Sequence, residues 1–298
     1  MAQTRFRPDR GLSARMVLTM VLLAALFVAL MWAIATYTTG GWWLGIIIGL
    51  GVFWAQWYFS DSLAMRGMQA REVTPEEEPE FHAMIDRLCA QANMPKPRVA
   101  ISELPMPNAF ATGRSPKRAV VCATRGIMQR LDERELEGVM AHELSHVAHR
   151  DVTVMTIASV VGILAGFLTR MTIWGGMGSR NRDSGAAFAV IMLVSIVVYA
   201  VSFLLTRLLS RYRELAADRA GAFLTGQPSH LANALTKITG QMAQIPAKDL
   251  RQAEPYNAFF FAPAFTNKVD LASLFSSHPP LEKRLEQLAK ISRELGRQ

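Results

Sequence analysis

The sequence predicts a mainly helical α+β protein, in which a water-facing domain is joined to about four membrane-spanning helices. Four long apolar runs predict the membrane part. Charged segments with short β-like stretches separate and follow these runs, and they predict the water-facing part. Hydrophobic residues make up 51% of the 298 residues, and the apolar runs rather than an unusually large core account for this proportion.

Residues 1–60 are predicted to form a membrane hairpin, with spans at about 16–37 and 42–59. The first run carries no charge and is long enough for ~30 Å of helix, which crosses one bilayer. A cleaved signal peptide is the alternative, because residues 33–35 resemble a cleavage site. The first run is too long for that interpretation, and a second apolar run follows at once.

Residues 61–151 have the composition of a soluble domain. The capping pattern at residues 74–77 predicts a helix that runs to about Asn93. Three β-like stretches follow, at residues 98–101, 108–112 and 118–123. A second helix is expected to begin near Asp132 and to run directly into the third apolar run.

Residues 152–208 are predicted to form a second hairpin, with spans at about 152–174 and 186–206. A hydrophobic hairpin packed inside a soluble core is the alternative, but the length of both runs favours spanning. Residues 209–298 are expected to form a mainly helical C-terminal part that ends in an amphipathic helix. The stretch at 255–265 has no assignment.

The distribution of arginines predicts which side of the membrane carries each part. With four crossings, the N-terminus, 61–151 and 209–298 share one side. The other side holds two arginines near the spans, Arg180 and Arg182. The shared side holds nine: Arg5, Arg7, Arg10, Arg15, Arg66, Arg71, Arg150, Arg211 and Arg213. The positive-inside rule therefore places the N-terminus and the water-facing parts of this multi-pass chain in the cytoplasm.

The net charge and the cysteines argue against a nucleic-acid-binding protein and against a cysteine metal site. The net charge of +8 is explained by arginines that flank the apolar runs, and no nucleic-acid-binding motif is present, so nucleic acid is not an expected partner. The two cysteines, Cys89 and Cys122, match no metal-ligand spacing.

His142, Glu143 and His146 form the pattern H-E-x-x-H on the predicted second helix. Residues four apart project from one face of a helix, so the two imidazoles can hold one metal ion. This spacing is typical of a zinc metallopeptidase in which the glutamate is the general base that activates zinc-bound water.

A catalytic zinc ion needs a third protein ligand. One large class of metallopeptidase places a histidine six residues after the second, but that residue here is Val152. His149 is a further helical turn along and too distant; a polar residue at the membrane surface is its simpler interpretation. The alternative third ligand is a glutamate on a second helix.

Glu214 is the first glutamate after the motif, because only Asp151 and Asp183 are acidic between His146 and residue 213. Asp218 lies four residues further on and shares its face, so it can accept the free N–H of a ligand histidine. The motif precedes the third apolar run and Glu214 follows the fourth, so two antiparallel helices would bring both to one surface.

These residues resemble the HtpX family of integral-membrane zinc metallopeptidases, relatives of the CAAX prenyl endoproteases. The resemblance covers the N-terminal hairpin, 108–113, 142–146, 213–221 and 277–284. It implies a zincin-type (gluzincin) domain with one Zn²⁺ per chain. It also implies a protease of the bacterial inner membrane, active in quality control of damaged or misfolded membrane proteins under stress.

Two site assignments rest on the resemblance alone. Asn108, Ala109, Phe110 and Ala111 would form the edge strand along which a peptide substrate pairs, although an ordinary strand with a turn after it is the alternative. His278 would stabilise the oxyanion of the reaction, whereas a surface histidine capping the last helix is its alternative.

The hypothesis is a zinc-dependent endopeptidase with ligands His142, His146 and Glu214, and with Glu143 as the base. A non-catalytic zinc-binding membrane scaffold is the alternative from another class. An intramembrane protease is less favoured, because the charged residues at 132–137 belong in water. The sequence leaves the oligomeric state and cleavage-site preference open.

Overall fold

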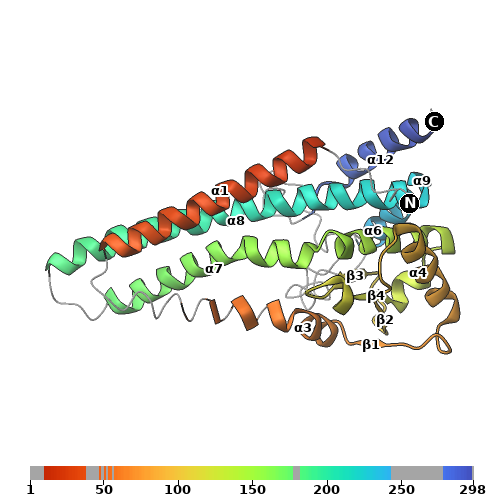
Figure 1. The fold of residues 1–298 in the computed structure, drawn as a ribbon, viewed down its shortest axis with the longest axis horizontal. Coiled ribbons are helices and arrows are strands. Elements are labelled where there is room, and N and C mark those ends of the chain that lie inside the picture. Colours follow the sequence, from red (N-terminus) through yellow and green to blue (C-terminus); the bar gives the residue numbers. More distant parts are fainter. Residues whose placement is uncertain are drawn as a thin grey trace.

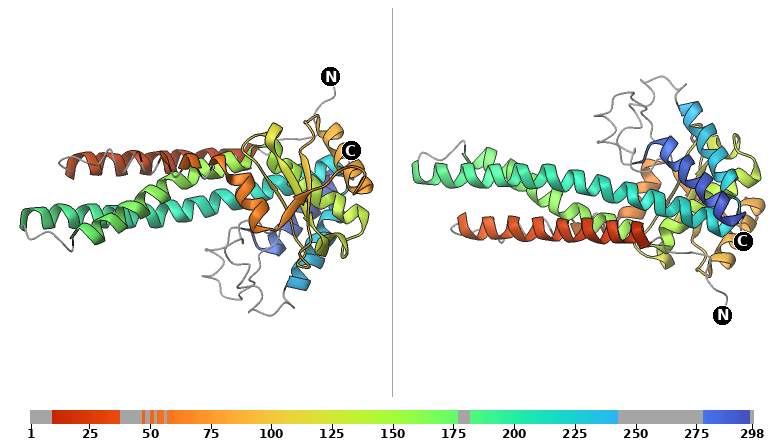
Figure 2. Two further views of the ribbon diagram at one scale, coloured as in Figure 1. Left: turned by 90° about the horizontal axis from the view of Figure 1, so that it is seen from below. Right: turned by 90° about the horizontal axis from the view of Figure 1, so that it is seen from above.

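A computed structural model describes residues 10–37, 47, 50, 51, 53–55, 57–176, 182–242 and 278–296. Figure 1 shows a bundle of long helices that leads into a mixed domain at one end. The long helices are α1 (Arg10–Tyr37), α7 (Asp151–Gly176) and α8 (Arg182–Thr225). The two views of Figure 2 show α1 running alongside α8 for most of its length.

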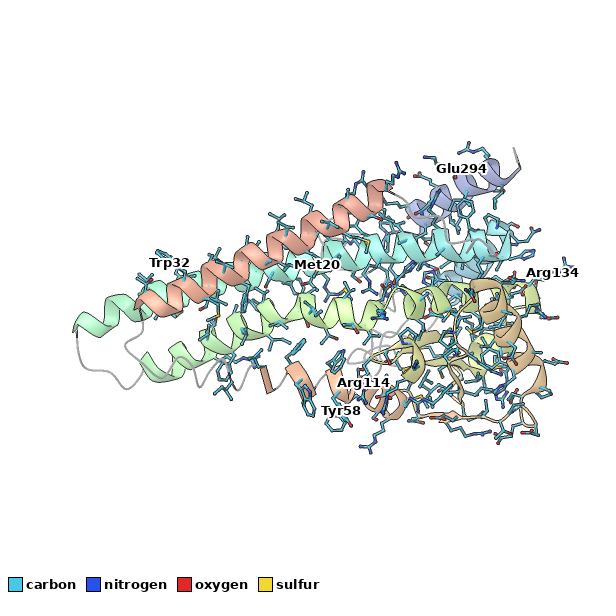
Figure 3. All side chains as sticks on the ribbon, in the orientation of Figure 1. Met20, Trp32, Tyr58, Arg114, Arg134 and Glu294 are labelled. Carbon is cyan, nitrogen blue, oxygen red and sulfur yellow. The ribbon has the colours of Figure 1, made fainter. Side chains whose placement is uncertain are left out.

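Among the described residues, three helices are long and apolar enough to cross a membrane: Arg10–Ala33, Asp151–Arg170 and Ala189–Thr225. They correspond to the spans predicted at 16–37, 152–174 and 186–206, whereas half of the span predicted at 42–59 lies outside the described residues. The outer faces of these helices are apolar; Trp32, labelled in Figure 3, points away from the bundle and is 67% exposed. An exposed apolar face of this kind suits contact with lipid.

Small residues allow α7 and α8 to pack closely within the bundle. A Cβ atom added at Gly162 would lie 3.2 Å from Ser202 Oγ, and one added at Gly166 would lie 3.4 Å from the ring of Tyr199. Glycines four residues apart let two membrane helices approach in this way. The contact between α7 and α8 fixes the relative positions of the residues at their ends, where the site lies.

The domain is built on a four-stranded sheet with strand order β1-β2-β4-β3. Its strands are β1 (Ala70–Glu72), β2 (Arg98–Ser102), β3 (Ala109–Thr112) and β4 (Val120–Thr124). β2 and β4 are parallel and the outer pairs antiparallel, so β3 lies at an edge. The three strands predicted from the sequence are confirmed, and the short polar strand β1 was not predicted.

Seven shorter helices complete the described chain: α3 (Ser60–Gly67), α4 (Pro79–Ala92), the 3-10 helix η1 (Pro116–Arg118), α5 (Arg125–Met128), α6 (Glu133–Ala148), α9 (Pro228–Met242) and α12 (Leu281–Leu295). The core of the domain lies between the sheet and α4, α6, α8 and α9, and Leu88, Ile101, Val121 and Leu144 are fully buried there. The amphipathic C-terminal helix predicted from about residue 280 is α12.

The predicted start of the first domain helix was wrong by four residues, because α4 begins at Pro79. A residue before proline is disfavoured in helical conformation, and Glu78 accordingly adopts φ −137° and ψ 67°. The capping pattern forms only a turn, in which the Thr74 N–H donates to Glu77 Oε2 at 2.8 Å. The helix ends as expected, with Asn93 in the left-handed conformation.

The predicted continuous helix through the H-E-x-x-H motif and the third apolar run is also corrected. α6 ends at Ala148, Arg150 has φ 55°, and α7 starts at Asp151. By contrast, α8 continues without a break from the fourth apolar run to Thr225, so the boundary expected at 208 lies inside one helix. The unassigned stretch 255–265 lies outside the described residues.

Candidate metal centre and substrate cleft

The helix that carries the motif has a well-defined start. The Glu135 N–H donates to Asp132 Oδ1 at 2.9 Å and the Asp132 N–H donates to Glu135 Oε2 at 3.1 Å, which is a complete capping box. α6 crosses α8 closely, since a Cβ atom at Gly221 would lie 2.9 Å from the backbone nitrogen of His142. The close crossing brings α8 within reach of the motif.

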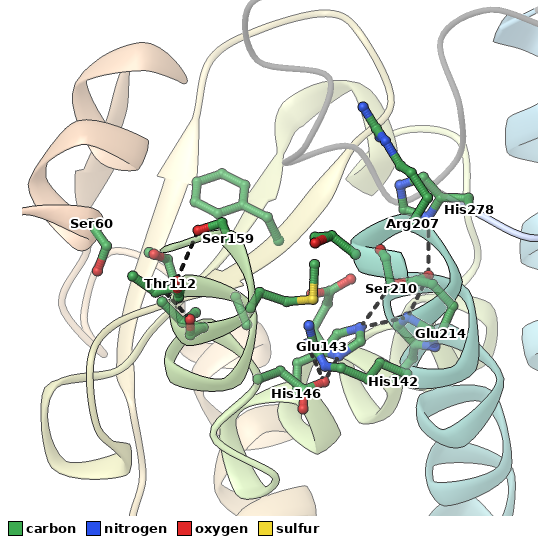
Figure 4. A pocket seen from close by; sticks show the side chains of 18 of the residues that line it. Ser60, Thr112, His142, Glu143, His146, Ser159, Arg207, Ser210, Glu214 and His278 are labelled. Carbon is green, nitrogen blue, oxygen red and sulfur yellow. Dashed lines mark hydrogen bonds and ion pairs between the residues drawn. The ribbon is translucent and has the colours of Figure 1, made fainter. Parts of the chain in front are cut away.

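The structure brings together the three residues predicted as metal ligands. One ligand atom from each of His142, His146 and Glu214 lies within 4.8 Å of the others. The two Nε2 atoms are 3.1 Å apart, and they lie 3.7 Å and 3.5 Å from the carboxylate oxygens of Glu214. Figure 4 shows the three side chains converging where α6 meets α8.

This geometry fits a bound zinc ion. Ligands about 2.1 Å from one tetrahedral ion lie about 3.4 Å from each other, which is close to the three separations found here. Two imidazole nitrogens and one carboxylate are also a ligand set of catalytic zinc. The donor atoms are therefore arranged as ligands of one metal ion.

Carboxylates on the far side of both imidazoles orient the rings. Asp218 Oδ1 lies 2.9 Å from His142 Nδ1, as predicted. Arg284, which is 2% exposed, donates to both oxygens of Asp218 at 2.8 Å and 2.6 Å. Arg284 was not predicted to belong to the site, because only tertiary packing brings α12 against α8.

Asp151 performs the same task for the second histidine. Its Oδ2 lies 2.5 Å from His146 Nδ1 and 2.5 Å from Nη2 of Arg213. From the sequence, Asp151 was passed over because a glutamate was expected as the third ligand, and it was given no other role. The available signal was an acid five residues after His146, but the turn at Arg150 that brings it back to His146 was not predicted.

We predict that Asp151→Asn lowers zinc affinity by about 10- to 100-fold, because a ligand histidine loses the charged group that orients its ring. Competition with a chromogenic chelator on the detergent-solubilised protein measures the change. Asp86→Asn is the matched control, since Asp86 is exposed and pairs only with Lys96 among the described residues. Equal zinc affinities of the two variants would contradict this role of Asp151.

Glu143 lies beside the metal ligands on the cleft wall and is 4% exposed. Burial raises the pKa of its carboxyl group to about 8, and the negative charge of Glu214 adds to this effect. A divalent cation on the adjacent ligands would lower that pKa, because positive charge favours the carboxylate. The group is thus placed to exchange a proton near neutral pH.

The two histidines differ in their affinity for protons. Burial lowers the pKa of His142, which favours the neutral form that binds metal. Burial also acts to lower the pKa of His146, but the hydrogen bond to Asp151 and nearby negative charges outweigh it and raise that pKa to about 9. Metal binding at His146 therefore displaces a proton.

His278 reaches the metal centre from the C-terminal part of the chain. Its Nδ1 lies 3.1 Å from Glu214 Oε2, and the side chain is 8% exposed. It does not cap α12, whose N-cap residue is Pro280, so the interpretation as a surface capping histidine was wrong. His149, by contrast, is exposed at the C-cap of α6 and is not part of the metal group.

A cleft of about 520 Å³ opens beside these residues. Its walls come from α3, β3, α6, α7, α8 and His278. In Figure 4, Ser60 and Thr112 lie across the cleft from Glu214 and His278. Ala109, Phe110 and Ala111 line the cleft, whereas Asn108 is fully buried and does not.

The register of β3 shows which of its backbone groups face outward. Asn108 and Thr124 form a hydrogen-bonded pair across β3 and β4, with the Thr124 N–H donating to the Asn108 carbonyl at 2.9 Å. Backbone direction alternates along an antiparallel strand, so Phe110 also bonds to β4. Ala109 and Ala111 consequently direct their N–H and C=O groups away from β4, and the backbone of Ala111 bonds to the Glu143 carboxyl group on that side.

Comparisons with known proteins agree with this site. The model of peptidase family M48 matches residues 75–292. Protease HtpX homolog 1 of Streptomyces coelicolor is 54% identical over 99% of this chain and 97% of its own length. Protease HtpX homolog of Moorella thermoacetica is 52% identical over 96% of both chains.

A solved structure has a similar fold at low sequence identity. The crystal structure of Ste24p from S. mikatae matches with a TM-score of 0.55 and 17% identity, over 94% of this chain and 67% of that chain. Together with the M48 match and the HtpX relatives, this likeness confirms the predicted mainly helical fold with a metallopeptidase domain. The chain belongs to peptidase family M48, as a membrane metalloprotease of the HtpX type.

Proposed function

We propose that the protein is a zinc-dependent endopeptidase of the bacterial inner membrane, which cleaves misfolded or damaged membrane proteins at the cytoplasmic face. The observation that carries the proposal is the convergence of His142, His146 and Glu214 beside Glu143, in a cleft bordered by an open strand edge. The excess of arginines on the side of the metal centre supports a cytoplasmic site.

His142, His146 and Glu214 would hold one Zn²⁺. When bound, zinc polarises a carbonyl group and lowers the pKa of water to about 7. Glu143 takes the proton of the attacking water and later delivers it to the leaving amine. The buried pairs of Asp218 with Arg284 and of Asp151 with Arg213 keep both imidazoles in the tautomer that presents Nε2.

The open edge of β3 positions the substrate. An extended peptide that adds to this edge would bond to the N–H and C=O groups of Ala109 and Ala111, with Phe110 as part of the wall. His278 lies on the opposite wall beside Glu214, where it is placed to donate a hydrogen bond to the oxyanion that develops on the scissile carbonyl. Asn108 would act indirectly, by fixing the start of β3.

The scaffold alternative is less well supported. A structural zinc site is closed by four protein ligands, whereas the group found within the described residues has three. An intramembrane site is also disfavoured, because α6 packs in the domain against β3, β4 and α9. The charged start of α6 would then lie in water.

We predict that cleavage of β-casein by protein purified in detergent without metal depends on added Zn²⁺. His146→Ala should abolish both zinc binding and cleavage, because one of three ligands is lost. His149→Ala is the matched control and should retain both, since this histidine is exposed and outside the metal group. Tight binding of one zinc ion without cleavage by the unmodified protein would favour the scaffold.

A further inference from the structure

The cleft does not end at the metal centre but continues along α7 and α8. The residues of α7 that line it are spaced as one helical face, at Val152, Met155, Thr156 and Ser159. The lining residues of α8 also form one face, which runs from Glu214 back to Phe203. One continuous space therefore connects the metal ligands to a region between two helices that are long and apolar enough to cross a membrane.

The length of this extension follows from helix geometry. Ser159 is eight residues beyond Asp151, which corresponds to about 12 Å along α7. Phe203 is eleven residues before Glu214, which corresponds to about 16 Å along α8. An extended peptide advances about 3.3–3.6 Å per residue, so the far end lies about four residues from a bond cleaved at the metal.

Met155, Ser159 and Phe203 define the far end of the cleft, where apolar surface lies beside the guanidinium of Arg207. The hydroxyl groups there are already bonded within their own helix, since Ser159 Oγ donates to the Thr156 carbonyl at 2.9 Å and Thr156 Oγ1 donates to the Val152 carbonyl at 2.6 Å. The guanidinium of Arg207 lies 4.9 Å from the centre of the Phe203 ring. Met155 and Phe203 therefore present sulfur, carbon and aromatic surface to an occupant.

The far end is continuous with the part of the cleft where a substrate would be cleaved. It shares one space with the edge of β3 and with Glu143, so a chain paired along β3 can extend into it. We infer that the far end of the cleft is a specificity site that binds a bulky apolar side chain about four residues from the scissile bond. This inference rests on the proposed function and adds a sequence requirement to it.

The requirement defines a substrate class. A polypeptide that leaves the membrane beside α7 and α8 would place its last apolar side chains at the far end of the cleft and its following residues at the metal. Cleavage is then expected close to the end of an apolar segment rather than at random in a loop. The gain from filling an apolar pocket is about 10-fold or more in kcat/KM for a large side chain over a small one.

Matched peptides test the inference. Mass spectrometry first identifies the fastest cleavage site in β-casein, and a peptide spanning it is made with either leucine or alanine about four residues from the cut, on each side in turn. Wild-type protein is compared with Ser159→Phe, which fills the far end. Ile157→Phe is the matched control, because Ile157 lies on the same helix, is 48% exposed and does not line the cleft.

We expect the leucine peptide to be cleaved about 10-fold faster than the alanine peptide at one of the two positions. Ser159→Phe should reduce this ratio towards one, whereas Ile157→Phe should preserve it. A wild-type ratio near one, or an unchanged ratio in Ser159→Phe as expected if a lipid chain fills the space, would overturn the inference. Failure of the wild-type protein to cleave any peptide would instead refute the proposed function.

A second variant covers the case in which Ser159→Phe does not fold. Phe203→Ala removes apolar surface from the other wall and should also lower the ratio, without filling the space. Zinc content and thermal unfolding of each variant identify those that retain the native structure. The same ratio in Phe203→Ala and wild-type protein would count against the specificity site.

Discussion

Replacing Glu143 by glutamine is expected to lower kcat/KM for β-casein by about 10²- to 10⁴-fold, the usual contribution of a general acid–base group. Glutamine has the same shape but cannot take up the proton of the attacking water. Glu143 is not in the metal group, so zinc should remain bound at one ion per chain. The carboxyl group of Glu143 is buried on the cleft wall. The other two carboxyl groups in the described cleft lining already have roles, because Glu214 is a metal ligand and Asp151 orients His146.

The measurement combines steady-state cleavage with metal analysis of the same preparation. Glu133→Gln is the control, because Glu133 lies on the same helix with 77% of its side chain exposed. It should cleave at the wild-type rate. If Glu143→Gln cleaved as fast as Glu133→Gln, the proton transfer assigned to Glu143 would be wrong; loss of zinc in Glu143→Gln would assign it to metal binding instead.

The metal centre could be predicted because its parts follow from local spacing. His142 and His146 share a face by helical periodicity, and so do Glu214 and Asp218. The pairing of these two elements followed from the order of the apolar runs, because a membrane hairpin returns to the side on which it began. The continuity of α8 makes this pairing more direct than expected, since one helix carries both the apolar run and the third ligand.

The remaining parts of the site depend on contacts between segments that no local pattern links. Arg284 is on the last helix and meets Asp218 only in the folded protein. The role of Asp151 depends on the turn at Arg150, which has no glycine to indicate a left-handed residue. Pro79 is the local signal for the start of α4, whereas the capping pattern at 74–77 predicts a start four residues earlier.

The same dependence on tertiary contacts makes Arg284 a sensitive position for stability. Arg284→Met is expected to lower the free energy of unfolding by about 3–5 kcal/mol, because Asp218 would be left as a buried charge without its partner. Asp218 is fully buried and Arg284 is 2% exposed, so water cannot replace the lost contact. Zinc affinity should also fall, since the orientation of His142 depends on Asp218.

Chemical unfolding followed by circular dichroism in detergent measures the change. Glu294→Gln is the matched control, because Glu294 pairs with Arg219 across the same two helices, α12 and α8, but is partly exposed. An exposed pair contributes at most about 1 kcal/mol. If Arg284→Met cost no more than this control, Arg284 would not be the group that compensates the charge of Asp218.

The double variant Asp218→Asn with Arg284→Met separates stability from metal binding. The double variant no longer leaves Asp218 as a buried charge without its partner, although Glu214, 3.8 Å from Arg284, still loses a nearby positive charge. We therefore expect the double variant to be more stable than Arg284→Met alone. Zinc affinity should stay below that of the wild-type protein, because a neutral amide orients His142 less strongly than a carboxylate. Recovery of both properties together would mean that the charge of Asp218 is not needed to orient His142. Recovery of stability alone would show that the pair of Asp218 with Arg284 serves to hold a metal ligand in place.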